Sequence, residues 1–319
     1  MKMLLLLAIQ NLLNNADSQS KSVYLFLVFV SCASDEFQVA DFAQSILRDE
    51  KYKDEKLFDT YLNSIMSKLM RRFRQVEIYP NSGAIMAILV NQITLSERVE
   101  FVLISAFEEV VKLVDISNGQ HLPYYVPALI SLKSVLINKV SSLIDSLLDR
   151  CGMVIGPAMP APVTISCINA ISIFIDQTTE EKKLILIAKL FPILMRRLDD
   201  TDLRIARTVP PAMLACHRCS GDFLSGRIYG TLIPRLIELL NRRSGLYMNY
   251  SAEYKFIDSI FEFFLSILPN IEITQKRMEL WKNVESAFKS SKLKNHEFKP
   301  KLQSCNNLIT EKMNAYKEE

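Results

Sequence analysis

The stretch "LFPILMRRLDD", Leu190 to Asp200, has a partial copy further along the chain, "LIPRLIELLNR", Leu232 to Arg242. In both, an apolar residue precedes a proline, apolar residues follow it, and a leucine precedes a polar turn. The two prolines, Pro192 and Pro234, are 42 residues apart. Repeats of about 40 to 47 residues are typical of HEAT and armadillo proteins, in which antiparallel helix pairs bury one face against their neighbours. This stretch therefore predicts an all-α, HEAT/armadillo-like helical-repeat solenoid.

The rest of the chain is compatible with helices in series. A weaker third copy, "YVPALISLKSVL", surrounds Pro127. In the segment 54–78 apolar residues recur with a period of about 3.6, which indicates an amphipathic helix and not a strand. No segment reads as a convincing strand. A non-repetitive helical bundle is the alternative to the repeat.

Helices are expected at residues 3–15, 22–33, 36–49, 54–78, 84–93, 95–116, 123–150, 164–176, 180–198, 201–219, 222–243, 251–268 and beyond 272. Ser96 or Thr94 is available as the N-cap of the helix at 95–116, and Asn118-Gly119 is suited to end it in left-handed backbone. The two glycines and three prolines between Cys151 and Val163 predict a loop. This divides the chain into an N-terminal helical-repeat part at 1–150, the loop at 151–163, and C-terminal HEAT-like repeats with a basic helical tail at 164–319.

Composition points to an ordinary globular protein. The chain has 319 residues, of which 49% are hydrophobic and 23% charged, with a net charge of +3. Such a balance excludes overall disorder and implies no electrostatic partner. Six cysteines without regular spacing favour a reducing compartment, so the cytoplasm, and with it the nucleus, is the expected location.

The apolar N-terminus permits two interpretations. "MKMLLLLAI" at 1–9 and "VYLFLVFVSCAS" at 23–34 together imitate a secretory signal. The first run lacks a cleavage site of small residues, and the second follows a stretch too long for the start of a signal. Neither reaches the roughly 18 apolar residues needed to span a bilayer. We therefore expect buried helices and no membrane partner.

The segment "LACHRCSGDFLSGR", Leu214 to Arg227, contains Cys216 and Cys219 in a Cys-x-x-Cys arrangement. This spacing is found in zinc sites and redox dithiols, but both cysteines follow the apolar stripe of the predicted helix, so both thiols are expected to be buried. They lie in its last turn, with Gly221 suited to the C-cap, and the negative end of a helix disfavours a thiolate. A structural zinc ion needs four ligands, and no second Cys-x-x-Cys exists. No metal, cofactor or catalytic residue is therefore expected.

The alternative to a protein-binding scaffold is a nucleic-acid-binding or transport-adaptor helical-repeat protein. "MRRFRQ", with Arg71, Arg72 and Arg74, and the basic tail 276–301 are compatible with nucleic-acid binding, which requires a continuous basic face with stacking aromatic residues. The chain has a single tryptophan, Trp281, and acidic residues throughout, so solvated helix faces are the simpler interpretation. A helical-repeat enzyme such as a base-excision glycosylase is the other rival, but no glycine-rich phosphate loop or nucleophile motif is present.

In the turn after the cysteines, Asp222 or Ser220 is expected to cap a helix, Phe223 and Leu224 to enter the core between repeats, and Arg227 to stay outside. Together with "LFPILMRRLDD", "LRIARTV" and "GRIYGTLIPRLIELL", this turn resembles the C-terminal HEAT region of the Tel-two-interacting protein one family over about residues 165–268. The positions that carry the motif are Pro192, Arg197, Leu198, Arg204, Cys219, Gly221, Asp222, Phe223, Leu224, Arg227, Ile233 and Pro234.

The resemblance implies a non-catalytic subunit of the Triple T complex. That complex works with a heat-shock chaperone and its adaptors to mature phosphatidylinositol-kinase-like protein kinases, so other Triple T subunits, these kinases and the adaptors are the implied partners. The sequence departs from the family in its inserted Ser220 and in Pro210-Pro211, where the family has an uninterrupted helix. The chain is also far shorter than the family's full-length scaffold, which puts part of the partner set in doubt.

Overall fold

The computed structural model describes residues 1–13, 15–49, 57–156, 159–243, 245–271 and 273–318, with side chains to residue 316. Over this part of the chain the secondary structure is helical, and the β contact is a single isolated bridge between Gly245 and Leu293. The prediction of an all-α helical-repeat protein is confirmed. The chain divides into two compact units, Met1–Arg150 and Cys151–Glu319.

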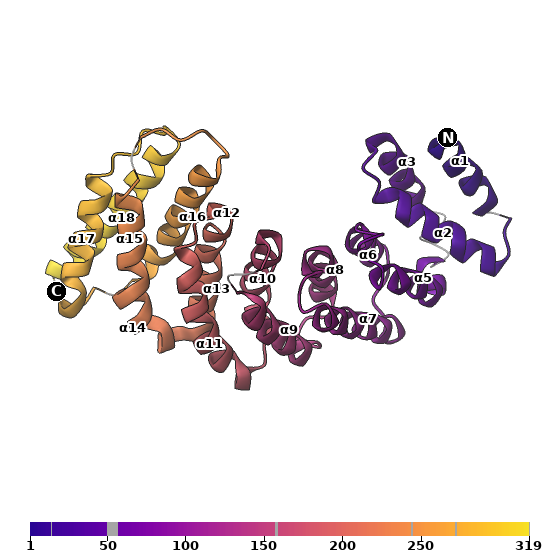
Figure 1. Cartoon of the computed structure of the whole chain (residues 1–319), viewed down its shortest axis with the longest axis horizontal. Helices are drawn as coiled ribbons and strands as arrows, with labels where there is room; N and C mark the ends of the chain where they lie inside the picture. Colours follow the sequence, from indigo (N-terminus) through magenta and orange to yellow (C-terminus); the bar gives the residue numbers. More distant parts are fainter. Residues whose placement is uncertain (14, 50–56, 157–158, 244, 272, 319) are drawn as a thin grey trace. The chain divides into compact units, whose positions relative to one another are not determined.

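The first unit is built of helices that pack in consecutive pairs (Figure 1). They are α1 (Lys2–Leu13), α2 (Ser18–Cys32), α3 (Phe37–Arg48), α5 (Leu57–Phe73), α6 (Ser82–Val90), α7 (Glu97–Ile116), α8 (Leu122–Val135) and α9 (Ser141–Val154), whose last turn belongs to the second unit. Helix α5 packs on α7 while α6 packs on α8, which is the two-layer stacking of helical repeats.

One glycine permits the close approach of α6 to α8. A Cβ atom on Gly83 would lie 2.5 Å from the backbone oxygen of Tyr124 and 3.3 Å from Cδ of Pro127. Real Cβ atoms do not approach a backbone oxygen to 2.5 Å. Glycine, which has no Cβ, therefore allows the two backbones to lie this close together. In this way α6 and α8 form a tight layer within the unit.

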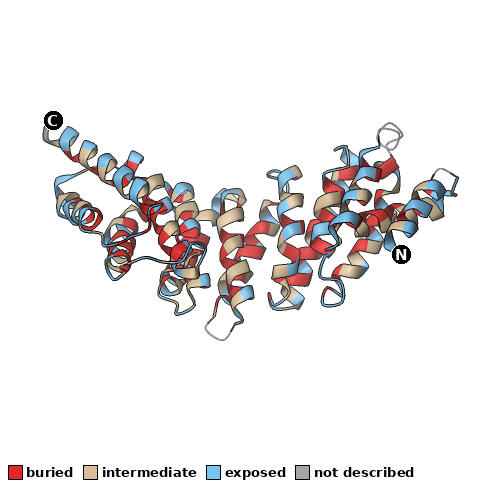
Figure 2. Ribbon diagram, turned by 90° about the horizontal axis from the view of Figure 1, so that it is seen from above, coloured by how far each residue is buried: buried red, intermediate tan, exposed pale blue. Residues whose placement is uncertain are grey.

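The second unit continues the pattern with helices interrupted by 3₁₀ and π turns. Its elements are α10 (Ala161–Phe174), η1 (Ile175–Gln177), α11 (Glu180–Leu198), α12 (Leu203–Ala206), α13 (Val209–Ser220), η2 (Gly221–Leu224), α14 (Ser225–Arg227), η3 (Ile228–Leu232), α15 (Ile233–Asn241), α16 (Ala252–Ile267), η4 (Leu268–Asn270), η5 (Gln275–Arg277), α17 (Met278–Lys289) and α18 (Phe298–Glu318). Helices α10, α13, α16 and α18 contact one another in that order, and α15 contacts α17. Buried residues follow these helix–helix contacts, as Figure 2 shows by colour.

Aromatic side chains fill much of this core. Phe261, Phe264 and Phe288 form close ring pairs, with centroids 5.2 Å apart for Phe264 and Phe288. Phe298 stacks on Tyr254 with centroids 4.7 Å apart. These contacts join α16, α17 and α18, so the last helices of the unit share one core with α16.

The predicted helix limits are confirmed where a local cap decides them. Ser96 accepts a hydrogen bond from the backbone nitrogen of Val99 and so caps α7. Asn118 and Gly119 have φ of 47° and 76°, and the Gly119 nitrogen bonds the Val114 oxygen to close the helix. Short polar residues and glycine therefore marked this helix correctly at both ends.

Two predicted boundaries around the second half of the first unit are wrong. The expected single helix at 123–150 is broken between α8 and α9, where Asn138 adopts a φ of 62°. The expected loop at 151–163 is much shorter, because α9 extends to Val154 and α10 begins at Ala161. Proline is compatible with the first turn of a helix, where its missing N–H is not needed, so the prolines did not exclude the start of α10.

The predicted helix at 222–243 is also not continuous. A 3₁₀ turn and a short α-helical turn precede a π-helical segment at Ile228–Leu232, and the regular helix begins only at Ile233. In a continuous α-helix the ring of Pro234 would clash with the carbonyl oxygen of Gly230. The wider π turn directly before Pro234 relieves that clash.

Candidate interaction site

The family-motif residues lie along one stretch of the second unit, from α11 to the start of α15. Pro192 is exposed inside α11, while Leu198 at the end of α11 is buried. Pro234 is exposed in the first turn of α15 and lines a groove of about 430 Å³ whose other wall includes Val284 of α17. The prolines therefore shape helices and surfaces, and Leu198 contributes to the core.

The turn between α13 and α15, here called the motif turn and defined as residues 219–227, changes chain direction at Gly221. Its φ of 52° and ψ of −132° are unfavourable for residues with a Cβ, which explains a glycine there. Leu224 is fully buried, as predicted, but Phe223 is 50% exposed. The expectation that both side chains enter the core is wrong for Phe223, because the 3₁₀ turn at Gly221–Leu224 directs successive side chains about 120° apart.

The motif turn contains no side-chain helix cap. The hydroxyl of Ser220 donates to the backbone oxygen of His217, and Asp222 accepts a 3.4 Å hydrogen bond from the Ser225 hydroxyl. Neither bonds a free backbone nitrogen of the following helix, so the expectation that Asp222 or Ser220 acts as an N-cap is wrong. The Asp222 carboxylate remains exposed to solvent.

Arg227, at the end of the motif turn, is exposed as predicted. Its guanidinium carbon lies 5.9 Å from the ring centroid of Phe191 in α11, within the range of a cation–π contact. Asp222, Phe223 and Arg227 thus present an acid, an aromatic ring and a base on one exposed turn, which we call the motif surface. Aromatic and arginine side chains are enriched among residues that dominate protein interfaces.

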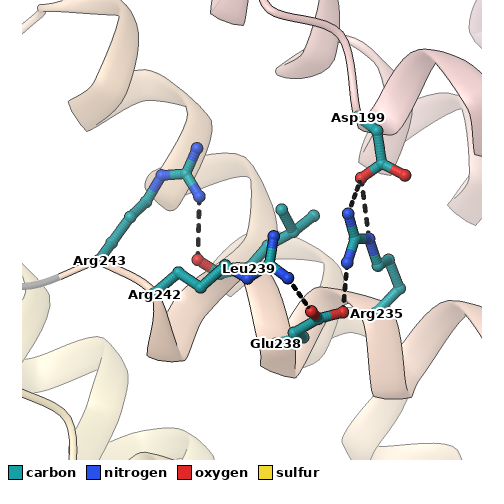
Figure 3. Close-up of polar contacts among 6 residues, drawn as sticks. All are labelled: Asp199, Arg235, Glu238, Leu239, Arg242 and Arg243. Carbon is teal, nitrogen blue, oxygen red and sulfur yellow. Dashed lines mark hydrogen bonds and ion pairs between the residues drawn. The ribbon is translucent and has the colours of Figure 1, made fainter.

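An ion-pair network ties α15 to the turn after α11 (Figure 3). Arg235 donates from Nε and Nη2 to Oδ1 of Asp199, at 2.8 and 2.6 Å, and from Nη1 to Glu238. Arg242 also bonds Glu238. The hydrogen bonds to Asp199, and then the bond to Glu238, raise the pKa of Arg235. The bond from Arg235 in turn lowers the pKa of Glu238. The network links α15 to the turn after α11, which belongs to the preceding repeat.

Further polar contacts order the turn between α11 and α12. Arg197 bonds Asp200 at 2.8 Å, with both side chains mostly buried. Arg204 bonds both carboxylate oxygens of Asp202, at 3.0 and 2.7 Å, and Asp202 also caps α12. The bond from Arg204 lowers the pKa of Asp202. Arg204, a motif residue, therefore supports a local turn and does not join the motif surface.

The Cys-x-x-Cys pair does not form an exposed dithiol. Cys216 is fully buried, and burial raises the pKa of its thiol to about 12. Cys219 is only half-buried, so the expectation of two buried thiols is wrong for this residue, which lies where α13 ends at the surface. Burial lowers the pKa of His217, whose Nδ1 atom has no hydrogen-bond partner among the described residues. Over the described ranges, no three His, Cys, Asp or Glu side chains are grouped to hold a metal ion.

The basic stretch at the end of α5 and directly after it, Arg71 to Arg74, does not present a continuous cationic face. Arg74 is paired with Glu109 at 2.8 Å, and the guanidinium of Arg72 lies against aromatic rings of its own unit. Trp281 is fully buried and contacts Tyr229 edge-on, so its ring is not available to stack a base. These contacts do not favour the nucleic-acid interpretation. Within the described chain, no helix has both the length and the apolar character to cross a membrane.

Sequence reasoning missed several residues of this region. Arg235 and Arg243 were not singled out, and Asp199 was noted only as part of the acidic turn Asp199-Asp200. Arg235 bonds Asp199, and Arg243 packs 4.7 Å from the Phe256 ring centroid while donating to the Leu239 oxygen. The signal available was a basic residue directly after Pro234 and an acidic turn one repeat earlier.

Comparison with known families supports the resemblance. Residues 162–306 match the family model described as the TTI1 C-terminal TPR domain. That name classes the repeats as TPR whereas their spacing predicts HEAT units, and both are stacked helix pairs. A search of curated proteins found no match to the chain. The match runs from α10 into α18 and includes the motif turn and the ion-pair network, and it supports a C-terminal region of the TTI1 type at residues 162–306.

Proposed function

We propose that this protein is a non-catalytic co-chaperone scaffold of the Triple T complex, which supports the maturation of phosphatidylinositol-kinase-like protein kinases. The observation that carries the proposal is the match of residues 162–306 to the TTI1 C-terminal TPR domain. The partners in this proposal are other Triple T subunits, kinases of that class and chaperone adaptors. The proposed compartments are the cytoplasm and the nucleus.

The motif surface is the proposed contact within the C-terminal region. Phe223 is half-exposed, and Asp222 and Arg227 are exposed and form no ion pair among the described residues; their contacts are a long hydrogen bond from Ser225 and a cation–π contact with Phe191. The neighbouring Leu224 and Gly221 do serve the fold, because one is buried and the other has positive φ. The exposed side chains of the motif surface are therefore accessible to a protein partner.

Affinity purification of the tagged protein from cells, followed by mass spectrometry, tests both proposals. The wild-type protein should recover Triple T subunits or a kinase of that class. The double variant Phe223→Ser with Arg227→Glu should reduce this recovery at least about tenfold, because truncating anchor residues of an interface costs more than about 1.4 kcal/mol.

A matched control is the double variant Phe101→Ser with Arg98→Glu on α7. Phe101 is 73% exposed and Arg98 is exposed, so the control removes the same chemistry from the other unit. Recovery should match the wild type. A wild-type preparation that contains only nucleic acid, lost steeply with added salt, would instead support the nucleic-acid rival.

A further inference from the structure

A pocket of about 340 Å³ opens on the first unit, outside the residues matched to the TTI1 family. Its walls come from the start of α1, the end of α2 and the turn between α5 and α6. Arg72, Ile78 and Tyr79 line it, together with the charged residues Lys2 and Asp35. Neither the family match nor the motif surface assigns a role to this pocket.

The Arg72 guanidinium contacts two aromatic rings. Its central carbon lies 5.1 Å from the ring centroid of Phe26 and 4.6 Å from that of Tyr79. A guanidinium that contacts aromatic rings can still donate hydrogen bonds from N–H groups that have no acceptor. Among the described residues, the Arg72 side chain has no ion pair and no hydrogen bond, whereas the Arg74 side chain, two residues on, is bonded to Glu109. Desolvation lowers the pKa of Arg72.

The pocket adds an apolar surface beside this cation. Leu5 and Ile78 are 57% and 69% exposed, and Val39 and Ile85 are buried at its floor. An exposed apolar patch rimmed by polar groups is typical of a site for another molecule. Its ligand should therefore combine an anionic group with a neighbouring apolar group.

The other charged residues at the pocket favour a ligand with one negative charge, such as a carboxylate, over a phosphate. Lys2 is the other cation of the pocket, and it is already paired with Glu36 at 2.6 Å. Asp35 also lines the pocket and is exposed. Two carboxylates near the rim would repel a dianion more strongly than a carboxylate, while one guanidinium can bind a carboxylate through two parallel hydrogen bonds.

We propose that this pocket binds a segment of a partner protein in which an Asp or Glu side chain neighbours a large apolar side chain. The carboxylate pairs with the in-plane N–H groups of Arg72, and the apolar side chain packs on Leu5 and Ile78. The proposal rests on the protein-binding function proposed above and adds the chemistry of one bound segment.

The test uses two peptides that differ by one group, acetyl-Leu-Glu-Leu-amide and acetyl-Leu-Gln-Leu-amide. Binding to the chain of residues 1–319 is measured by NMR from the methyl signals of Leu5, Val39 and Ile85. A charge-assisted bond to a carboxylate is stronger than one to a neutral amide, so the Glu peptide should bind about 10-fold to 100-fold more tightly.

Three variants identify the group responsible. Arg72→Gln should abolish the difference between the peptides, and Arg72→Lys should restore part of it, because lysine keeps the charge but not the paired donors. Arg74→Gln is the matched control and should leave the difference unchanged, since Arg74 is exposed and bonded to Glu109. Circular dichroism checks that each variant is folded.

Equal binding of the two peptides to the wild type, or an unchanged difference in Arg72→Gln, would overturn the proposal. Tighter binding of the phosphoserine peptide, acetyl-Leu-phosphoserine-Leu-amide, would overturn the choice of a carboxylate. The peptide test uses only purified protein and synthetic peptides, so it is independent of the purification of partners from cells. A negative peptide result with intact recovery of Triple T subunits rejects the pocket alone, and the reverse pattern rejects the scaffold proposal alone.

Discussion

Arg235 of α15 bonds Asp199, 36 residues earlier at the end of α11, through two nitrogen atoms at 2.8 and 2.6 Å (Figure 3). The two residues occupy consecutive repeats of the second unit, so this ion pair joins repeats and not merely turns of one helix. In a helical repeat the contact between neighbours is a main source of stability. The pair is partly exposed, at 25% and 44%, which limits its strength.

Replacement of Arg235 by alanine should therefore lower the free energy of unfolding by about 0.5 to 1 kcal/mol, because an exposed ion pair contributes little and the network loses its central cation. Urea denaturation followed by circular dichroism measures the change. Arg204→Ala is the control, since its partner Asp202 lies in the same turn. A larger loss in the control than in Arg235→Ala would show that repeats are not coupled by this pair.

The same network should weaken in acid. The pKa of Glu238 is below its ordinary value of 4.5, first because of the bond from Arg235. A carboxylate with a lowered folded-state pKa stabilises the fold above its unfolded-state value, and this contribution is lost as pH falls through the lowered one. The stability difference between wild type and Glu238→Gln should therefore be present at neutral pH and shrink below about 4.5. A difference that is constant with pH would contradict the role given to this carboxylate.

Gly83→Ala should destabilise the first unit. The new methyl group would lie 2.5 Å from the Tyr124 backbone oxygen, so α6 and α8 must separate. Overpacking costs about 1 to 3 kcal/mol, which outweighs the gain of about 0.5 to 1 kcal/mol from replacing a helical glycine. Thermal unfolding measures the effect.

Gly230→Ala is the matched control for Gly83→Ala. Nothing lies within 4 Å of a Cβ atom at that position. This variant should unfold at the wild-type temperature or slightly above it. Equal destabilisation by both variants would mean that the close approach of α6 and α8 does not decide the outcome.

The two cysteines of the motif should react at very different rates. Cys216 is fully buried and its thiol pKa is about 12, so almost no thiolate is present at pH 8, whereas Cys219 is half-buried. Iodoacetamide should label Cys219 first in the native protein, as read by peptide mass spectrometry. Faster labelling of Cys216 would contradict its burial.

Cys216→Ala should lower the free energy of unfolding by about 1 to 3 kcal/mol through lost packing, with no change in bound metal. Chemical denaturation and metal analysis of the purified protein measure the two effects. Stoichiometric zinc in the wild type that is lost in the variant would overturn the packing role.

The sequence predicted features that depend on neighbours in the chain. Ser96 and Asn118-Gly119 mark α7 because a cap and a left-handed turn involve only adjacent residues. Loop predictions were weaker, because proline and glycine are compatible with helix ends as well as with loops. Gly152, for example, is helical, and a Cβ there would lie 2.9 Å from Cδ2 of Leu190.

The candidate sites were less predictable, because they depend on contacts between elements and not on neighbours in the chain. Whether Phe223 is buried depends on the direction of a 3₁₀ turn, and whether Arg72 is paired depends on rings brought to it from α2 and from the turn after α5. Neither relationship follows from spacing along the chain. The motif turn was found by its residue pattern, but its exposed members were identified only from the packed structure.

By itself the sequence determined the helical class, the repeated Pro192 and Pro234 units and the TTI1-like motif, because helix periodicity and repeat length are local and recur along the chain. The tertiary structure alone decided that Phe223 is exposed, that Arg235 bonds Asp199 and that Arg72 lines a pocket without an acidic partner among the described residues. Burial and ion pairing depend on contacts between residues tens of positions apart, and those contacts exist only once the helix pairs have stacked.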